Sequence, residues 1–346
     1  RIDRSLGETL YSVETTGINI RMHDSPPANF LVVGLGEALF DCFDDRATLG
    51  GAPINFAVHV NQLLQPLGGM ATVVSRIGKD ALGRQLLQEM SAHGLSLDNN
   101  QQDEHFPTGS VQVRLDATGQ PTYDIASEVA WDHLTSTEKM SDLAAHCHAV
   151  CFGTLAQRSA TSRQAIQKFL QGAHRALRIF DVNLRQDFYD ADVVEQSLRL
   201  ANVVKLNQEE LQLTCRLLDL KSAAGSGNET ENAFTICQTY ELDALALTRG
   251  ELGTLIFTKD GCFEGTVGHY PNAGNADSVG AGDGCCAAFA CGMLLGWPWE
   301  HVVDMANRVG AFVAAQPGAT PDLPAELISA AQQHGQTDLR APRPDR

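Results

Sequence analysis

Basic residues are scarce in this sequence. Its 346 residues include 25 Lys and Arg against 42 Asp and Glu, which gives a formal net charge of −17. A protein that binds nucleic acid needs a basic surface for the phosphates, so this balance excludes nucleic acid as the main partner. It does not exclude an anionic ligand that backbone N–H groups hold locally.

Long apolar runs and the cysteine pattern of a secreted protein are also lacking. The largely apolar run 284–299 contains Pro298 and is too short to cross a bilayer, and no stretch near the first residue resembles a signal peptide. The nine cysteines are odd in number, and Cys285 and Cys286 are adjacent, unlike a framework of disulfides. We therefore expect no membrane partner, reduced thiols and a cytoplasmic location.

The two ends of the chain lack a sustained helical or strand period. Residues 1–28 end in Ser25-Pro26-Pro27, and residues 332–346 contain Pro342 and Pro344. We expect a loose N-terminal extension over 1–28, a tail over 332–346 and one domain over 29–331.

The middle of the chain alternates short apolar runs with amphipathic stretches. Runs that are apolar at consecutive positions predict buried parallel strands at 30–34, 71–75, 149–152, 178–182, 203–206, 244–248 and 254–258. Helices are expected over 54–64, 161–177 and 207–218, and up to His93 with Asp80 as the cap and Gly94 as the stop. Residues 221–231 are predicted to be a surface loop. The repeated βα units predict an α/β fold, in which a mainly parallel sheet carries helices on both faces.

A hairpin interrupts this α/β pattern. Residues 110–115 alternate apolar and polar side chains, 116–120 form a turn, and 121–125 return. Together with residues 39–49 the hairpin is expected to form a small sheet. The pattern alone leaves two interpretations open, an ornament at the edge of the fold or a lid over a cleft made by about 39–49 and 108–126.

The densest chemical signal is Asp277-Ser-Val-Gly-Ala-Gly-Asp283, which precedes an expected helix over 284–295. Gly280 and Gly282 flank Ala281, so the backbone can approach a ligand closely. N–H groups at a helix N-terminus favour an anion, and Asp283 adds a carboxylate in the same turn. A phosphate cradle beside a base is what phosphoryl transfer to an alcohol requires. The alternative is a glycine-rich helix entry in which Asp283 only complements the helix dipole.

This segment resembles the C-terminal signature of the ribokinase-like (PfkB) carbohydrate kinases. Five further stretches resemble other motifs of that family, in the family's order: Gly50-Gly-Ala-Pro-Ile-Asn55, Gly78-Lys-Asp-Ala-Leu-Gly83, Asp181-Val-Asn-Leu-Arg185, Lys205-Leu-Asn-Gln-Glu-Glu210 and Thr248-Arg-Gly-Glu-Leu-Gly253. The resemblance is of fructokinase type. It implies a ribokinase-like three-layer α/β core with a small β lid, ATP as the phosphoryl donor and a sugar hydroxyl as the acceptor.

The resemblance also implies roles on the phosphoryl side of a site. Asp283 matches the catalytic base, and Gly280, Ala281 and Gly282 match the anion hole. Asn207 and Glu210 match the Asn-x-x-Glu motif, which helps to place hydrated Mg²⁺ and the phosphates. The resemblance implies that Glu210 acts on Mg²⁺ through water.

The resemblance also implies positions for the nucleotide and for a monovalent cation. The residues that match positions along the nucleotide are Thr248, Gly250, Gly253 and Asn307. A monovalent-cation site, for K⁺, matches Asp277, the backbone of Val279 and Gly318. Ser278-Val279 replaces the Thr-Thr of the commonest signature, so a threonine hydroxyl is lost beside that site.

On the sugar side, Glu37-Ala-Leu-Phe-Asp41 resembles the fructokinase form of the first strand end, where Asp41 can accept hydrogen bonds from two sugar hydroxyls. Gly51 lets the sugar approach the backbone, and Asn55 offers both a donor and an acceptor. Arg185 can donate to sugar oxygens or pair with the carboxylate of an acid sugar. Without the resemblance, Asp41 would be read as a solvated acid and Asn55 as a helix cap.

The sequence thus predicts an ATP-dependent sugar kinase that phosphorylates a primary hydroxyl, with fructose as the first choice. Because lids of this family often form dimer interfaces, we expect a homodimer through the β lid. A 2-keto-3-deoxygluconate kinase is the nearest alternative, and a nucleoside kinase is a more distant one. A non-catalytic regulator that binds nucleotide or sugar is the alternative from another class, and the intact Asp283, Asn207 and Glu210 argue against it.

Weaker motifs are set aside. Gly34-Leu-Gly36 begins like a dinucleotide fingerprint but lacks its third Gly, and no P-loop sequence is present. His146-Cys147-His148 with Cys151 has metal-like spacing, but 149–152 is predicted to be a buried strand, where Cys packs as a small apolar residue. Cys285 and Cys286 are expected to pack their helix, and the anion site beside them leaves a lowered thiol pKa open.

Overall fold

The fold is built on one central sheet. The structure is a computed structural model that describes residues 29–42, 47–115, 121–220 and 228–334, with the backbone alone for 113–115 and 121–123. The strands lie in the order β14-β13-β12-β11-β10-β9-β1-β4. Those from β4 to β12 pair in parallel, and β13 and β14 extend one edge in antiparallel. Their bounds are β1 Leu31–Leu35, β4 Met70–Val74, β9 Ala149–Phe152, β10 Leu177–Asp181, β11 Val203–Asn207, β12 Ala244–Thr248, β13 Thr254–Thr258 and β14 Gly261–Glu264.

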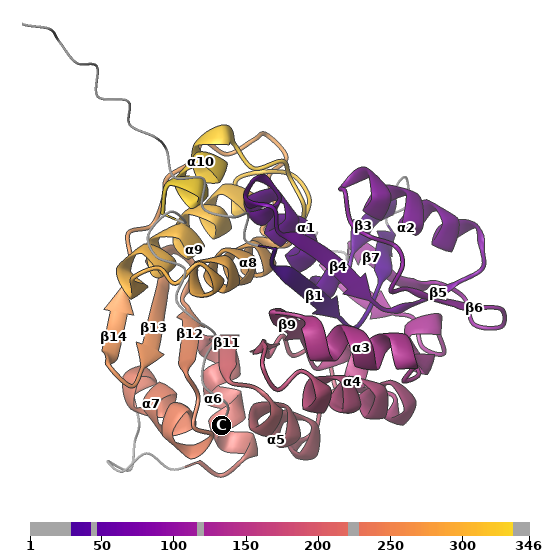
Figure 1. The fold of residues 1–346 in the computed structure, drawn as a ribbon, viewed down its shortest axis with the longest axis horizontal. Helices are drawn as coiled ribbons and strands as arrows, with labels where there is room; N and C mark the ends of the chain where they lie inside the picture. The colour runs from indigo at the N-terminus through magenta and orange to yellow at the C-terminus, as the bar shows by residue number, and fades with distance from the viewer. Residues whose placement is uncertain (1–28, 43–46, 116–120, 221–227, 335–346) are drawn as a thin grey trace, which may run out of the picture.

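Helices cover both faces of this sheet (Figure 1). One face carries α1 Ala52–Leu64, α8 Ala281–Leu294, α9 Trp299–Ala314 and α10 Ala325–His334. The other carries α3 Glu138–His146, α4 Ala160–Gly172, α5 Ala191–Leu200, α6 Gln208–Leu217 and α7 Glu229–Thr239. All four residues of β9 are buried, because side chains that alternate across an inner strand meet a helix layer on either side. The predicted three-layer α/β core is confirmed.

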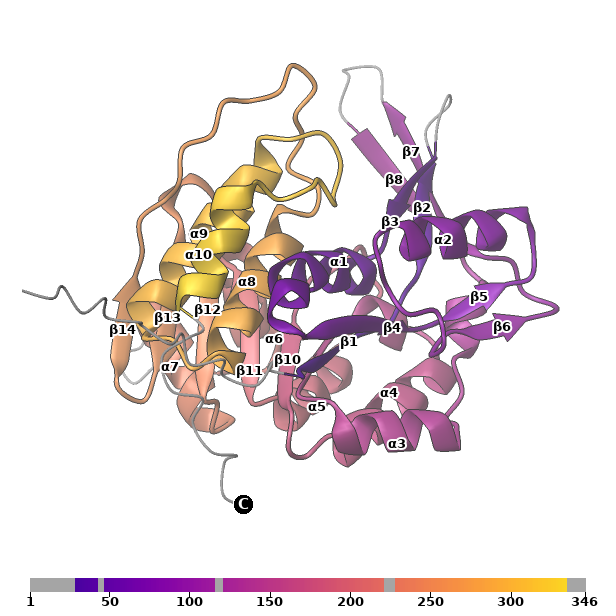
Figure 2. The same ribbon diagram turned by 45° about the horizontal axis from the view of Figure 1, so that its top comes forward.

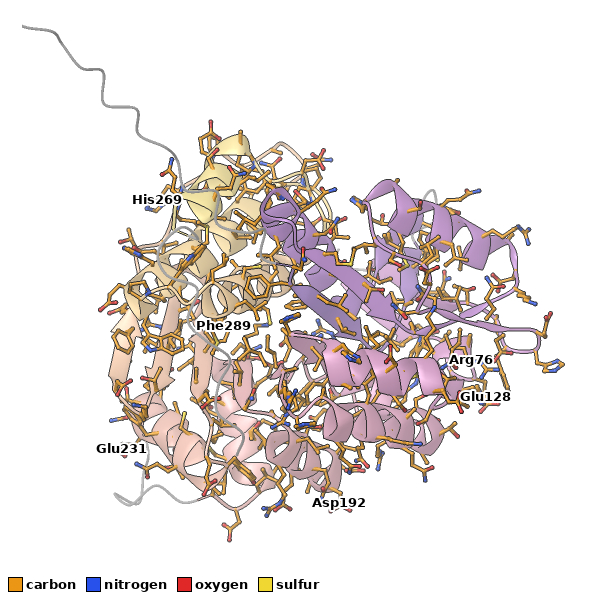
Figure 3. The ribbon with its side chains drawn as sticks, in the orientation of Figure 1. Arg76, Glu128, Asp192, Glu231, His269 and Phe289 are labelled. Carbon is orange, nitrogen blue, oxygen red and sulfur yellow. The ribbon has the colours of Figure 1, made fainter. Side chains whose placement is uncertain are left out.

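The helix α8 is buried along most of its length. Its residues from Gly284 to Gly292 are all buried, and Figure 3 shows Phe289 inside the molecule while Asp192 lies at its rim. A helix that is apolar on all sides belongs in the interior, and α8 packs between α1 and α9. The sequence therefore dictates that the Gly-rich start of α8 is held rigidly by the core behind it.

A second sheet carries the predicted hairpin. Its order is β3-β2-β7-β8, with bounds β2 Leu39–Cys42, β3 Ala47–Gly50, β7 Gly109–Leu115 and β8 Pro121–Ile125. It projects from the main body beside α1 and α2 Ala81–Ala92 (Figure 2). The turn 116–120 and residues 43–46 of the expected lid lie outside the described residues. A separate parallel pair joins β5 Arg76–Gly78 to β6 Gln101–Asp103.

Short 3-10 turns link several of these elements. Their bounds are η1 Gln65–Leu67, η2 Ala130–His133, η3 Leu155–Gln157 and η4 Gly250–Leu252. The cap predicted at Asp80 is present, because its side chain accepts from the Gly83 N–H at 2.7 Å.

Several expected boundaries differ from the structure. The helix expected over 161–177 ends at Gly172, because the chain turns at Ala173 to enter β10. The loop expected over 221–231 gives way to α7 near its end, since Asn228 caps that helix through the Glu231 N–H. The tail expected from residue 332 begins later, because α10 buries Leu327 and Ala331 and runs through His334.

Two expectations concern the membrane and the N-terminus. Among the described residues, no helix combines the length and the apolar character that crossing a membrane requires. The extension expected over 1–28 lies outside the described part of the chain.

Candidate active site

Polar and acidic residues gather at the carboxyl ends of the parallel strands. Asp181 ends β10, Asn207 ends β11 and Thr248 ends β12, while Glu37 follows β1. Ligands of open α/β sheets bind along this edge, where loops leave the strands. The start of α8 faces the same edge, since Gly282 lies against the Lys205 side chain of β11.

The first turn of α8 has the form of an anion cradle. Gly280 is the N-cap with φ 77°, a left-handed conformation that only glycine adopts without strain. A Cβ at this position would stand 2.4 Å from the Ala319 carbonyl oxygen. Ala281 begins the helix and Gly282 and Asp283 follow, so their N–H groups have no acceptor within the helix. The Ala281 N–H donates to the Ser278 carbonyl at 3.3 Å. These residues present backbone donors and the positive end of the helix dipole to a ligand.

Asp283 is half-buried at the end of this cradle. Its Oδ2 accepts a hydrogen bond of 2.8 Å from Nδ2 of Asn55. This bond joins α1 to α8 through one residue from each of two predicted motifs. Burial raises the pKa of Asp283, and Lys205, the Asn55 hydrogen bond and Arg185 oppose that rise. A base in this position has a defined orientation and a proton affinity set by its neighbours.

The sequence analysis missed a buried ion pair behind the cradle. Lys205 Nζ lies 3.0 and 3.1 Å from the two carboxylate oxygens of Asp181, which is its direct neighbour across β10 and β11. Burial acts to lower the pKa of Lys205, but Asp181 and Glu210 outweigh it and raise the pKa, so the ammonium is retained. The same Nζ lies 2.9 Å from where a Cβ on Gly282 would stand. A fixed positive charge therefore contacts the cradle.

A lysine inside an apolar strand was the signal for this pair. Charged residues are rarely buried unless they are paired, and Lys205 interrupts Val203-Val204-Lys205-Leu206. The quoted motifs contained both Lys205 and Asp181, but no role was assigned to either residue.

The predicted sugar-side residues surround the N-terminus of α1. Gly51 caps this helix with φ 104°, and a Cβ there would stand 2.7 Å from the Glu37 carbonyl oxygen. Asp41 is half-buried on β2; burial raises its pKa to about 6, helped by Asp277 and Asp283 and opposed by Arg185. Arg185 thus shares one electrostatic environment with Asp41 and Asp283.

Glu37 is a further carboxyl group that the sequence analysis did not select. Its side chain lies against the Ala52 N–H at the start of α1, where Gly51 has no side chain to cap the helix. Burial raises the pKa of Glu37 to about 7, and its Oε2 has no partner within the described part of the chain. Glu37 therefore adds a second titrating group close to Asp283.

Asn207 and Glu210 form a reciprocal cap at the start of α6. The Asn207 side chain accepts from the Glu210 N–H at 2.9 Å, and Glu210 Oε2 accepts from the Asn207 N–H at 2.9 Å. Glu210 Oε1 also accepts from the Leu184 N–H at 3.0 Å. The pair thus has a structural role, and the same contacts fix its orientation toward the site. A cavity of about 470 Å³ adjoins it, lined by residues that include Arg185, Tyr189 and Arg216.

The predicted nucleotide residues also meet one another. Thr248 Oγ1 donates to the Leu206 carbonyl at 3.3 Å, and Gly250 and Gly253 bound a 3-10 turn with positive φ values. A Cβ on Gly253 would stand 3.0 Å from Nδ2 of Asn307, which itself donates to the Gly265 carbonyl at 3.1 Å. The turn after β12 and the buried Asn307 of α9 therefore form one surface.

Asp277, Val279 and Gly318 are brought together as expected. Asp277 Oδ1 accepts from the Val279 N–H at 3.1 Å, and its Oδ2 accepts from the Gly318 N–H at 3.2 Å. These contacts hold the loop before α8 against the loop after α9. Within the described ranges, no group of three or more His, Cys, Asp or Glu side chains has the arrangement of a metal site.

The thiol pKa values differ from one expectation. Cys285 and Cys286 pack in the core as expected. Burial raises the pKa of the Cys285 thiol to about 11, and the hydrogen bond with Cys151 together with burial raises the pKa of the Cys286 thiol. Burial outweighs the nearby helix N-terminus, so these thiols stay protonated. His148 is used structurally, since its Nδ1 accepts from the Leu31 N–H.

Comparison with known proteins decides the family. A family model described as pfkB family carbohydrate kinase matches residues 14–326, which is most of the chain and begins within the expected extension. The chain belongs to this family. It is therefore a carbohydrate kinase, a phosphotransferase that acts on a sugar hydroxyl, as the motifs predicted.

Individual relatives agree with this assignment. The chain is 28% identical to a fructokinase of Escherichia coli over 320 residues, covering 84% of this chain and 95% of the relative. It is also 28% identical to a putative sugar kinase of Pyrococcus horikoshii over 281 residues, covering 78% and 82%. A crystal structure of fructokinase with bound ATP from Xylella fastidiosa superposes with a TM-score of 0.72 at 22% identity, covering 88% of this carbohydrate kinase and 99% of that chain.

Proposed function

We propose that this carbohydrate kinase transfers the γ-phosphoryl group of ATP to a primary hydroxyl of a neutral sugar, fructose in the first instance. The observation that carries the proposal is the position of Asp283. It is half-buried, oriented by Asn55 and placed in the first turn of the helix that Gly280 caps. A relative named fructokinase and a fructokinase structure with bound ATP support the choice of substrates.

In this proposal Asp283 takes the proton of the attacking hydroxyl. The N–H groups of Gly280, Ala281 and Gly282 stabilise negative charge on the transferred group, which is the main electrostatic requirement of phosphoryl transfer. Lys205 adds a positive charge beside Gly282 that is already fixed by Asp181 and needs no reorganisation. Thr248, Gly250, Gly253 and Asn307 form the surface along which the nucleotide extends.

Mg²⁺ and K⁺ belong to the proposal as well. Mg²⁺ keeps several waters and binds through phosphates with one or two carboxylates, so a site with few protein ligands suits it. Glu210 is the carboxylate that fits, through water, because backbone N–H groups already hold both its oxygens. When bound, the ion neutralises charge on the phosphates. A monovalent cation beside the contacts that join Asp277 to Val279 and Gly318 would order the cradle.

Charge favours a neutral sugar over an acid sugar. Arg185 is the cation on the sugar side, and it interacts with three carboxyl groups, those of Glu37, Asp41 and Asp283. The carboxylate of 2-keto-3-deoxygluconate would compete with these groups for one guanidinium and be repelled by them. Asp41, Gly51 and Asn55 are then free to bind the hydroxyls of a neutral sugar.

The small sheet supplies the proposed lid. Its β2 strand carries Asp41 directly above the start of α1, so movement of the sheet would close on the sugar and exclude water, a competing acceptor. We further propose that two copies pair through this sheet and that the enzyme works in the cytoplasm.

A coupled kinase assay tests the proposal. ATP consumption is measured with fructose, ribose, 2-keto-3-deoxygluconate and adenosine, each with and without K⁺. The proposal predicts the highest kcat/KM with fructose, and Asp283→Asn should lower kcat by about 10² to 10⁴ while ATP still binds by calorimetry. ATP binding without turnover on any acceptor would favour the non-catalytic regulator instead.

A further inference from the structure

One face of α1 is polar although most of the helix is buried. Asn55, His59 and Gln62 lie at spacings i, i+4 and i+7, which places them on one side of the helix. Asn55 reaches Asp283, His59 reaches the Ala319 carbonyl, and Gln62 Nε2 donates to the Pro321 carbonyl at 3.2 Å. The helix that caps the sugar side is thus bonded along its length to the other half of the molecule.

His59 makes the central bond of this series. Its side chain is fully buried, and its Nε2 lies 2.9 Å from the Ala319 oxygen. Because a carbonyl only accepts, Nε2 carries the proton. Burial lowers the pKa of His59 to about 4, so the ring is neutral, and its Nδ1 has no partner among the described residues.

The residue that His59 holds is also the one that contacts the cradle. A Cβ on Gly280 would meet the Ala319 oxygen, Cα and Cβ at 2.4 to 2.7 Å, so the two backbones are in close contact. One residue earlier, Gly318 donates to Asp277 of the loop that leads into α8. A shift of Ala319 would therefore be transmitted to the start of α8 through two contacts, its own contact with Gly280 and that of Gly318 with Asp277.

A purely packing role would not require this side chain. An apolar residue of similar size would fill the space between α1 and α8 without burying an unpaired nitrogen, which costs free energy. Gln62 secures the same segment further along, where its Oε1 also accepts from the Leu323 N–H at 2.6 Å. Two successive polar side chains of α1 are thus used to fix residues 319–323.

We propose that His59 is a positioning residue, which holds Ala319 and through it the Gly280 turn and the Asp277–Gly318 contact in the geometry that phosphoryl transfer and cation binding require. This inference rests on the proposed function for its catalytic consequence. Its structural part, the order of the cradle, stands independently of any substrate.

The test compares four variants. His59→Leu removes the donor and keeps an apolar side chain of similar reach. His59→Asn places its amide nitrogen at the δ position, too short to reach Ala319, and serves if the Leu variant does not fold. His59→Gln restores a donor at the ε position. Asn61→Leu is the matched control, because Asn61 is a buried amide of the same helix whose Nδ2 donates to the His93 carbonyl at 3.1 Å, away from the cradle.

Hydrogen exchange gives a readout without substrate. The amides of 277–284 should exchange at least tenfold faster in His59→Leu and His59→Asn than in the unchanged protein, and at the original rate in His59→Gln and Asn61→Leu. Equal acceleration in Asn61→Leu, or none in His59→Leu and His59→Asn, would overturn the proposal.

Kinetics give the second readout. A displacement of about 1 Å in a reacting geometry costs up to ~100-fold in rate, so kcat should fall by 10- to 100-fold in His59→Leu while the KM for sugar changes little. In His59→Leu the K⁺ concentration for half-maximal activation should also rise. His59→Gln should recover most of the lost kcat and most of the K⁺ response. If the unchanged protein has no kinase activity, the proposed function is refuted and the exchange result alone decides on His59. If the unchanged protein is active and His59→Leu has the same kinetics, the positioning role is refuted.

Discussion

Nδ2 of Asn55 donates a 2.8 Å hydrogen bond to Oδ2 of Asp283, across 228 positions of sequence. The bond joins the start of α1, on the sugar side, to the start of α8, on the phosphoryl side. It orients the carboxylate and also lowers its pKa against the effect of burial. Two motifs that were selected separately from the sequence are thus joined by a direct hydrogen bond between their last residues.

The first prediction concerns Asp283 itself. Asp283→Asn keeps the shape of the side chain and removes its capacity to take a proton, so kcat should fall by about 10² to 10⁴, the usual worth of a general base. ATP affinity, measured by calorimetry, should stay within a few-fold. Asp192→Asn, at an exposed position on α5, is the control and should leave kcat unchanged. Normal turnover in Asp283→Asn would exclude this residue as the base.

The second prediction uses the pH profile of Asn55→Ala. The Asn55 hydrogen bond lowers the pKa of Asp283, so removing it raises that pKa further. A base must be ionised to act, and activity is lost as pH falls through its pKa. The acidic limb of the kcat profile should therefore move to higher pH in Asn55→Ala. An unmoved limb, with only a higher KM for sugar, would limit Asn55 to substrate binding.

Much of this site could be predicted because its motifs are local. The run from Asp277 to Asp283 indicates a helix start and a glycine-rich turn by residue type alone, and both are present, with Asp283 in the first turn of α8. The parallel sheet followed in the same way from short apolar runs, with 149–152, 244–248 and 254–258 identical to β9, β12 and β13.

The residues that were missed depend on contacts between distant segments. Lys205 and Asp181 become a pair only because β10 and β11 are adjacent in register. His59 reads as one more residue of an apolar helix until the loop at Ala319 is placed against it. Glu37 acquires its raised pKa from burial that no local pattern reports. Local sequence encodes the cradle, whereas tertiary packing sets its electrostatics.

The third prediction separates stability from catalysis at the buried ion pair. Lys205→Met leaves Asp181 as an unpaired buried charge, which should lower the free energy of unfolding by about 3–5 kcal/mol. It also removes a charge that lowers the pKa of Asp283, so kcat should fall at neutral pH. The double variant Lys205→Met with Asp181→Leu should regain most of the stability in urea titrations but not kcat. Recovery of both would show that Lys205 serves the fold alone.

The fourth prediction compares two glycines that flank α8 and have similar φ angles. Gly280 has φ 77° and Gly296 has φ 69°, but a Cβ would meet the Ala319 backbone at 2.4 Å only at Gly280 and nothing within 4 Å at Gly296. Both alanine variants carry the strain of a left-handed residue, of order 1–3 kcal/mol. Gly280→Ala should in addition lower kcat more than tenfold, because the cradle must shift. Equal kinetic losses in Gly296→Ala would assign the effect to strain rather than to the cradle.

The last prediction concerns Glu37 and the dependence of stability on pH. Burial raises its pKa from 4.5 to about 7, so the folded protein binds a proton between these values that the unfolded chain releases. The free energy of unfolding therefore decreases as pH rises from 4.5 to 7, and above 7 the buried charge costs up to about 3 kcal/mol, from 1.36 kcal/mol per pKa unit. Glu37→Gln removes this cost and should be more stable than the unchanged protein at pH 8, while the two should be similar near pH 4.5. Urea unfolding at both values measures the difference, and a constant gap at the two pH values would show that Glu37 stays ionised in the fold.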